Sequence, residues 1–167
     1  MTTGGLVISE LAFGRGRLGL CPLPGRSVQG FAADLASIVA WAPEVVLTLT
    51  GAEEMAGHGA GALGAALEAA GIGAVHLPVP DYGTPGPEAE ARWPGISRRL
   101  RAVLVPGGRV LVHCLGGCGR SGMIALRLMI EAGEPAAPAL ARLREARPCA
   151  IETGAQHLWA RAPRALC

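Results

Sequence analysis

The chain has 167 residues, long enough for one compact domain, and half of them are hydrophobic while only 17% are charged, which excludes a disordered protein. The net charge is +2, and the 15 basic residues are all arginines scattered along the chain, so we expect no nucleic-acid partner. No apolar stretch is long enough to span a membrane, and the N-terminus lacks the basic start of a signal peptide.

Short apolar runs alternate with helix-like stretches along most of the chain. We expect residues 1–17, which are rich in glycine, to form a partly ordered N-terminal segment, and residues 18–167 to form a single domain. Strands are predicted at residues 18–21, 45–49, 74–79 and 109–113, and helices at residues 28–41, 60–70, 94–105, 121–132, 136–146 and 153–162. Ser27 is predicted to cap the first helix.

This alternation predicts an α/β fold. We expect a central, mostly parallel sheet of four to five strands that is flanked by helices. The strand at residues 109–113 is so apolar that it should lie in the middle of the sheet. A loop between such a strand and a helix is where α/β proteins place their ligands, so we expect a phosphate-binding loop after this central strand.

A glycine-rich segment follows the central strand directly. It runs His113-Cys114-Leu-Gly-Gly-Cys-Gly-Arg120-Ser121-Gly122. The residues between the first cysteine and the arginine can curl so that their backbone N–H groups point inward toward an anion, because glycine tolerates the positive φ angles of such a curl. The following helix directs its positive end at the same place. The predicted phosphate-binding residues are Leu115, Gly116, Gly117, Cys118, Gly119 and Arg120.

Cys114 is the predicted nucleophile of this loop. The helix N-terminus and the neighbouring guanidinium group favour its thiolate form, which can attack phosphorus. Arg120 should grip two phosphate oxygens with its planar fork, a geometry that lysine cannot copy. Ser121 is expected to donate a hydrogen bond to the thiolate and help it depart, and His113 is expected to orient the loop rather than act as a base.

The pattern His-Cys-x5-Arg-Ser at residues 113–121 resembles the signature of the protein tyrosine and dual-specificity phosphatase superfamily. The chain looks most like the compact dual-specificity branch, in particular the cyclin-dependent-kinase-associated phosphatases and their bacterial relatives. Residues 18–25 resemble the first strand and turn of that group, residues 81–85 its acid loop and residues 150–156 its late catalytic segment. The resemblance implies the cysteine-phosphatase fold and a reaction through a phosphocysteine intermediate.

The resemblance also implies that Asp81 is the general acid. Asp81 lies in a Pro/Gly-rich loop after a predicted strand, at a separation from Cys114 similar to that in related phosphatases. It would protonate the leaving group and later deprotonate the attacking water. Glu53 and Glu54 are the alternatives for the acid role. Tyr82, next to Asp81, either lines the lip of the pocket or packs the loop.

The late catalytic segment departs from the pattern of the family. Related enzymes position the hydrolytic water with a glutamine in a Gln-Thr-x-x-Gln segment, whereas this chain has Glu152 at the first position and Gln156 at the second. A glutamate can accept a hydrogen bond from water, but its charge sits poorly beside a phosphate. Either Gln156 positions the water, or Glu152 does so, or Glu152 points away.

The five cysteines are an odd number without the spacing of a disulfide framework, so we expect a cytoplasmic protein. Cys118 either forms a protective disulfide with Cys114 under oxidation, through a sulfenic acid, or is a small residue that fits the loop. Cys21, Cys149 and Cys167 are expected to be structural or exposed. Neither the cysteines nor the dispersed histidines have the spacing of metal ligands, so we expect no metal and no other cofactor.

The sequence therefore predicts a phosphatase that hydrolyses phosphate monoesters on protein tyrosine, serine or threonine, with a phosphorylated protein or peptide as its partner. One alternative keeps the chemistry and changes the substrate to a phosphoinositide, a nucleotide or an RNA 5′-phosphate. The uncharged residues between Cys114 and Arg120 count against a phosphoinositide, since inositol-directed relatives tend to carry lysines there. A second alternative is a phosphate-binding module without activity, although such modules generally lose the cysteine, the arginine or the acid.

Overall fold

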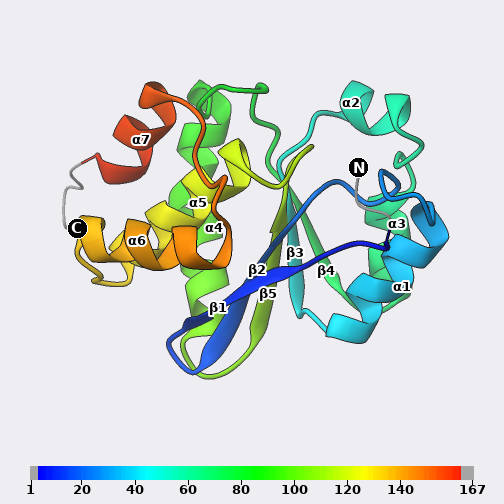
Figure 1. Ribbon diagram of the computed structural model, residues 1–167, viewed down its shortest axis with the longest axis horizontal. Helices are drawn as coiled ribbons and strands as arrows, with labels where there is room; N and C mark the ends of the chain where they lie inside the picture. Colours follow the sequence, from blue (N-terminus) through cyan, green and yellow to red (C-terminus); the bar gives the residue numbers. More distant parts are fainter. Residues whose placement is uncertain (1–3, 163–167) are drawn as a thin grey trace.

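A five-stranded sheet forms the centre of the molecule (Figure 1), whose residues 4–162 are described by a computed structural model. Its order is β1-β2-β5-β3-β4, and all neighbours are parallel except β1 and β2. The strands are β1 (Ser9–Phe13), β2 (Gly16–Cys21), β3 (Val45–Thr48), β4 (Gly73–His76) and β5 (Arg109–His113). The mostly parallel sheet and the central position of the last strand confirm the fold that the sequence predicts.

Helices cover both faces of the sheet. They are α1 (Phe31–Trp41), α2 (Ala52–Gly57), α3 (Leu63–Ala69), α4 (Pro87–Leu104), α5 (Gly119–Glu131), α6 (Ala136–Ala146) and α7 (Gly154–Arg161). In Figure 1, α1 and α3 lie on one side of the sheet, while α4, α5 and α6 lie on the other, with α7 packed on α5. Among residues 4–162, no helix has the length and apolar character needed to cross a membrane.

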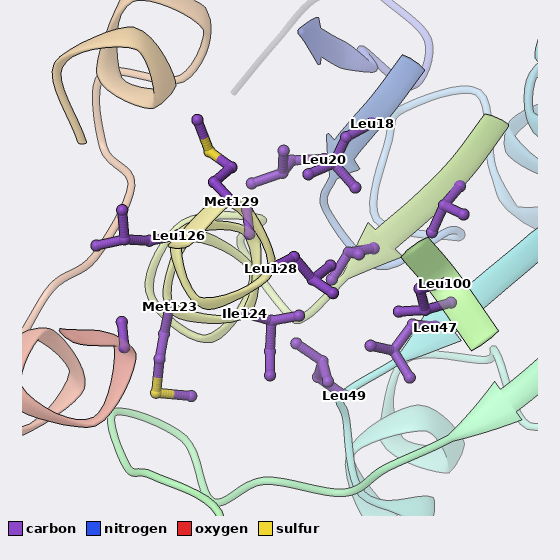
Figure 2. Close-up of a cluster of buried hydrophobic side chains, with 14 of the residues drawn as sticks. Leu18, Leu20, Leu47, Leu49, Leu100, Met123, Ile124, Leu126, Leu128 and Met129 are labelled. Carbon is purple, nitrogen blue, oxygen red and sulfur yellow. The ribbon is translucent and has the colours of Figure 1, made fainter. Parts of the chain in front are cut away.

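The larger hydrophobic core surrounds α5. Every residue of this helix from Gly119 to Met129 is buried, which is expected of a helix enclosed on all sides. Figure 2 shows Ile124 and Leu128 projecting toward leucines of β2 and β3, while Leu126 projects to the opposite side of the helix. Strand β5 serves both faces of the sheet, because Val110 and Val112 belong to this core while Leu111 points into the smaller core on the α1 side. Burial on both faces holds the end of β5 in a fixed place.

Part of the glycine-rich N-terminal segment is a strand that the sequence analysis did not predict. Residues 9–13 form the edge strand β1, which pairs antiparallel with β2. The turn between the strands uses Gly14 at a φ of 57°. Leu11 and Phe13 alternate with exposed residues and are buried in the larger core, so the strand contributes apolar surface that the glycine content obscured.

The first helix begins at Phe31, three residues later than the predicted start, and Ser27 does not cap it. The buried carboxylate of Asp34 explains the delay. It accepts hydrogen bonds from the backbone N–H groups of Gly25 and Ser27, and from the hydroxyl group of Ser27. Residues 25–27 are therefore held in a loop, and this loop packs against the glycine-rich segment after β5.

Helix α4 begins earlier than predicted, at Pro87, and contains Pro94 in its interior. A proline inside a helix costs about 3 kcal/mol because it removes a hydrogen bond and crowds the preceding turn. For this reason the sequence analysis placed Pro94 at the start of the helix and not in its interior. The structure keeps the helix continuous because residues on both sides of Pro94, including Ala89, Trp93 and Leu100, are buried in the larger core. Pro87 is well suited to the first turn.

Gly122 of α5 offers a test of how tightly the core packs around the site. A Cβ atom there would lie 2.6 Å from the backbone nitrogen of Ile151 and 2.8 Å from the Cβ of Ala150. In an open helix Gly→Ala stabilises by about 1 kcal/mol, whereas overpacking costs about 1–3 kcal/mol. We therefore expect Gly122→Ala to lower the free energy of unfolding in urea. Gly95→Ala in α4, where a Cβ would meet nothing within 4 Å, should raise it; two changes of the same sign would contradict the prediction.

Candidate active site

The glycine-rich loop begins where the central strand ends, and His113 anchors its first residues. The imidazole of His113 is fully buried, with Nε2 2.8 Å from the hydroxyl oxygen of Thr48 and Nδ1 3.3 Å from the carbonyl oxygen of Cys114. Burial lowers the pKa of His113 to about 4, so the ring is neutral at neutral pH. This environment fits the predicted orienting role and not that of a base.

The carbonyl groups of three consecutive loop residues point away from the curl. The carbonyl of Leu115 accepts hydrogen bonds from Nη1 of Arg26 at 2.8 Å and from the backbone of Leu23 at 3.0 Å. Arg147 donates to the carbonyls of Gly116 at 2.8 Å and Gly117 at 3.0 Å. In a trans peptide the N–H group points opposite to the carbonyl group. The N–H groups of the three following residues are therefore directed inward, as an anion site requires.

Neither Arg26 nor Arg147 was a predicted site residue. Both lie far from the loop in the sequence, and an isolated arginine carries no signal of the carbonyl that it will meet. Gly117 shows why the loop needs glycine: its φ is 72°, and a Cβ would lie 2.6 Å from the carbonyl carbon of Cys21. The end of β2 thus presses against the outer side of the loop.

Arg120 is the most heavily bonded residue of the site. Only 1% of its side chain is exposed. Its Nη1 and Nη2 atoms each donate to one carboxylate oxygen of Glu54 at 2.8 Å, and Nη1 also donates to the carbonyl of Val79 at 3.0 Å. Asp81 approaches as well, with Oδ1 3.1 Å from Nη2. The guanidinium group is thereby held in one orientation at the start of α5.

These contacts bear on which of the three candidate carboxylates, Asp81, Glu53 or Glu54, can donate a proton. The hydrogen bond from Arg120 is the largest influence on Glu54 and holds the pKa of that carboxyl group below its usual value, which makes Glu54 a poor proton donor. For Arg120, burial favours a lower pKa, but the hydrogen bonds of Glu54 and the charges of Cys114, Glu54 and Asp81 outweigh it and raise the pKa. Glu53, the third candidate, is exposed.

The loop that carries Asp81 reaches the site from the strand edge. Tyr82 adopts a left-handed conformation with a φ of 58°, and its backbone N–H donates to Oδ1 of Asp81 at 3.0 Å. The tight turn places the Asp81 carboxylate against Arg120 and leaves the Tyr82 ring 63% exposed. Tyr82 therefore lies at the rim of the site and does not pack the loop.

Cys114 is buried, and so is a second free thiol, Cys21, which pairs with His113 across strands β2 and β5 and is an electrostatic neighbour of Cys114. Burial, followed by the neighbouring Cys114, raises the pKa of Cys21, so Cys21 remains protonated and is no competing nucleophile. Ser121 is fully buried, and its hydroxyl oxygen has no hydrogen-bond partner among the described residues. Within residues 4–162, no cluster of three or more histidine, cysteine, aspartate or glutamate side chains is arranged to hold a metal ion.

The late segment places Glu152 and Gln156 differently. Glu152 turns toward the loop, where Oε1 accepts the backbone N–H of Gly119 at 2.7 Å. Gln156 is buried and caps α7, because its amide oxygen accepts the N–H groups of Glu152 at 3.0 Å and Thr153 at 3.3 Å. Its amide nitrogen donates to the carbonyl of Gly83 in the acid loop at 3.3 Å. Gln156 thus joins the two segments; both side chains lie beside Gly119, and Glu152 is the one that bonds its N–H group.

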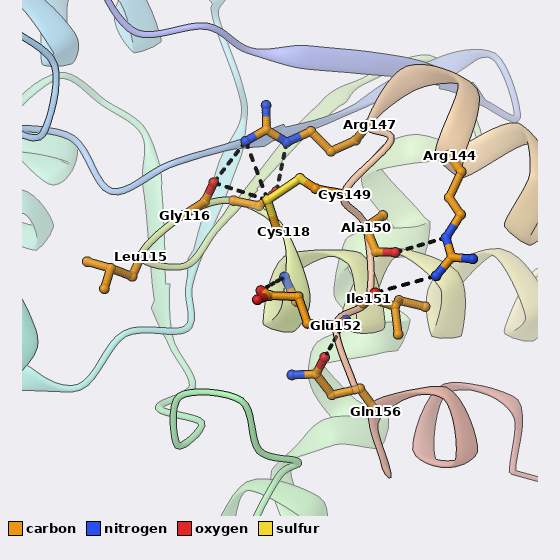
Figure 3. Close-up of a disulfide and its surroundings, with 12 residues drawn as sticks. Leu115, Gly116, Cys118, Arg144, Arg147, Cys149, Ala150, Ile151, Glu152 and Gln156 are labelled. Atoms are coloured by element: carbon orange, nitrogen blue, oxygen red, sulfur yellow. Dashed lines mark hydrogen bonds between the residues drawn. A yellow bond between two sulfur atoms is a disulfide. The ribbon is translucent and has the colours of Figure 1, made fainter. Parts of the chain in front are cut away.

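A disulfide joins Cys118 to Cys149 (Figure 3). Neither of the two alternatives for Cys118, a disulfide with Cys114 under oxidation or a small residue that fits the loop, included this bond, and Cys114 is a free thiol. Disulfides persist mainly in oxidising surroundings, so the cysteine count no longer supports the cytoplasmic location that we expected.

Cys167 lies outside the described residues. The bond ties the loop to the segment that carries Glu152, and the backbone N–H of Ile151 adds a hydrogen bond to the carbonyl of Cys118 at 3.2 Å.

The chain is similar to known phosphatases in sequence family and in fold. Residues 32–134 match the family described as "Tc-R-P: Polymorphic toxin system, DSP-PTPase phosphatase". The fold is similar to that of a kinase associated phosphatase (KAP) with its catalytic site cysteine substituted by serine, at 24% identity and a TM-score of 0.82, over 95% of this chain and 93% of that chain. Tk-PTP in the active form is similar at 28% identity and a TM-score of 0.69, over 92% and 97% of the two chains. PTPMT1 in complex with PI(5)P shares the fold at 15% identity and a TM-score of 0.70, over 92% of each chain.

The disulfide should stabilise the folded protein. It closes a loop with a sequence separation of 31 residues, and such bonds contribute about 2–4 kcal/mol. We expect Cys149→Ser to lower the free energy of unfolding by this amount in urea titrations without reductant. Dithiothreitol should lower the stability of the wild type to that of the variant and leave the variant unchanged. Equal stabilities, or peptide mapping that links Cys118 to another cysteine, would contradict the assignment.

Proposed function

This chain belongs to the DSP-PTPase phosphatase family of polymorphic toxin systems, and we propose that it hydrolyses phosphate monoesters on proteins through a phosphocysteine intermediate on Cys114. The chain is a phosphatase by its family. The observation that carries the mechanism is the inward-facing loop between β5 and α5, closed by an arginine that two carboxylates orient. The kinase associated phosphatase of similar fold also has a catalytic site cysteine.

In the first step the Cys114 sulfur attacks phosphorus, and the bond from phosphorus to the ester oxygen breaks. The phosphoryl oxygens are bound by the inward N–H groups of residues 116–118 and by the guanidinium group of Arg120, which stabilise the charge of the transition state. Asp81 gives its proton to the departing oxygen. Asp81 suits this role better than Glu54 because its side chain is 48% exposed and meets Arg120 through one oxygen, whereas both carboxylate oxygens of Glu54 are bound by Arg120.

In the second step water attacks the phosphocysteine. Asp81, now a carboxylate, takes a proton from the water, the bond from sulfur to phosphorus breaks, and inorganic phosphate leaves. The departing Cys114 thiolate needs a hydrogen-bond donor. Ser121 is suited to this task because its buried hydroxyl group has no other partner among the described residues.

Phosphorylated protein is the substrate class that the site supports best. The residues between Cys114 and Arg120 are uncharged, so the loop itself offers no extra cations to the further phosphates of a phosphoinositide, although PTPMT1, a protein of similar fold, binds one. The exposed Tyr82 ring at the rim provides an apolar surface for the side chain that bears the phosphate. A panel of phosphotyrosine, phosphoserine and phosphothreonine peptides, compared with phosphoinositide vesicles, tests this choice.

Hydrolysis of a small aryl phosphate tests the proposed chemistry. The wild type should release inorganic phosphate, and Cys114→Ser should reduce the rate by about a thousandfold or more because the serine hydroxyl is a much weaker nucleophile. Rapid quenching followed by mass spectrometry should detect a phosphorylated Cys114 in the wild type. A folded wild type without activity would favour the phosphate-binding module instead.

Substitutions of Asp81 and Glu54 should change the pH dependence of turnover in different ways. Asp81→Asn is expected to lower turnover about 10²–10⁴-fold and to abolish the fall in rate at high pH that deprotonation of a general acid produces. Glu54→Gln should retain this fall, because Arg120 holds the pKa of Glu54 too low for proton donation. The exposed Glu53 provides the matched control, and Glu53→Gln should behave like the wild type. If Glu54→Gln and not Asp81→Asn removes the fall in rate, the acid role belongs to Glu54.

A further inference from the structure

The carboxylate of Glu152 accepts a backbone N–H group of the residue that precedes Arg120. The N–H group that it accepts, at 2.7 Å, belongs to Gly119, the first residue of α5. The free N–H groups at the start of a helix carry its positive dipole end and are a preferred site for anions. A Cβ on Gly119 would lie 2.5 Å from Oε1 of Glu152, so the carboxylate lies directly against the loop backbone.

The backbone that carries Glu152 is anchored from several directions (Figure 3). The disulfide from Cys118 reaches Cys149, and Ile151 bonds the carbonyl of Cys118. Nε of Arg144 donates to the carbonyl of Ala150 at 3.0 Å. The Glu152 residue itself is exposed, in contrast with its buried neighbour Ile151. A fixed backbone with an exposed side chain allows the carboxylate to leave Gly119 by rotation while it stays near the loop.

We propose that Glu152 competes with phosphate for the anion site. While the site is empty, the Glu152 carboxylate accepts the Gly119 N–H group, and when phosphate displaces the carboxylate, its nearby charge weakens the binding of the phosphate. This inference rests on the proposed function, because it assumes that the loop binds phosphate. Two like charges cannot share one N–H group, so phosphate must displace the carboxylate and then tolerate its charge nearby.

The competition determines how tightly the enzyme retains anions. Arg120, the helix end and the inward N–H groups together form a strong site for inorganic phosphate, which is also the product of the reaction. A carboxylate that returns to Gly119 as phosphate leaves lowers the affinity for the product. Glu152 is thus a residue that sets anion affinity, whereas a neutral side chain at this position would leave the product more tightly bound.

Calorimetric titration of the full chain with inorganic phosphate tests the proposal without relying on turnover. Glu152→Gln keeps a carbonyl oxygen for the Gly119 N–H and removes only the charge, so phosphate affinity should rise about tenfold. Glu145→Gln, which removes an exposed carboxylate from α6, is the matched control and should leave the affinity unchanged. Glu152→Ala should also bind more tightly, even if the loss of the hydrogen bond lowers its melting temperature.

The outcomes separate this inference from the proposed function. If Glu152→Gln and Glu152→Ala bind phosphate no more tightly than the wild type, Glu152 only caps α5 and the inference is wrong, while the function stands. If Glu145→Gln tightens binding as much as Glu152→Gln does, the effect is one of net charge and the inference is equally wrong. If folded wild type does not bind phosphate, or if Arg120→Ala binds it as well as the wild type, the proposed function fails and the inference falls with it.

Discussion

The architecture of the site depends on the guanidinium group of Arg120, which is almost entirely buried. Burying a charge is tolerated only when partners satisfy it, and Arg120 draws its partners from different parts of the chain. Glu54 comes from α2, while Val79 and Asp81 come from the segment after β4. The short helix α2, the acid loop and the start of α5 are therefore positioned by one another. The same contacts give the carboxylates different tasks, since Glu54 is committed to orienting Arg120 while Asp81 stays at the rim.

The loop itself depends on contacts made from outside its curl. Glycine allows the chain to bend, but the N–H groups of the bend face inward because Arg26 and Arg147 bind the carbonyl groups on the outer side. Residues 25–27 are held in turn by the buried Asp34. The Cys118–Cys149 disulfide adds a covalent tie beside Arg147, and it joins the loop to the segment that carries Glu152. Glu152 brings a negative charge to the Gly119 N–H group, whereas a glutamine could bond the same group without a charge.

Much of the fold could be predicted from local pattern. Strand β5 was predicted with its observed bounds because five consecutive residues, four of them apolar or buried, stand between glycines and the loop. The errors have a common cause, which is that tertiary contacts overrode local preference. Pro94 argued for a helix start but lies inside α4, whose buried face extends on both sides of it. Ser27 argued for a helix cap but bonds Asp34 instead, and the short α2 has too few residues to show a period.

The sequence by itself placed the residues of the proposed chemistry in one register: a cysteine, a glycine-rich curl and an arginine between a strand and a helix. Because these residues are consecutive in the chain, the loop could be recognised from local pattern alone. The tertiary structure alone decided that Cys118 pairs with Cys149, that Glu54 holds Arg120, that Arg26 and Arg147 orient the loop, and that Glu152 turns toward Gly119. Single charged residues and cysteines carry no periodic signal, and their partners are chosen by the packing of segments that lie far apart in the sequence.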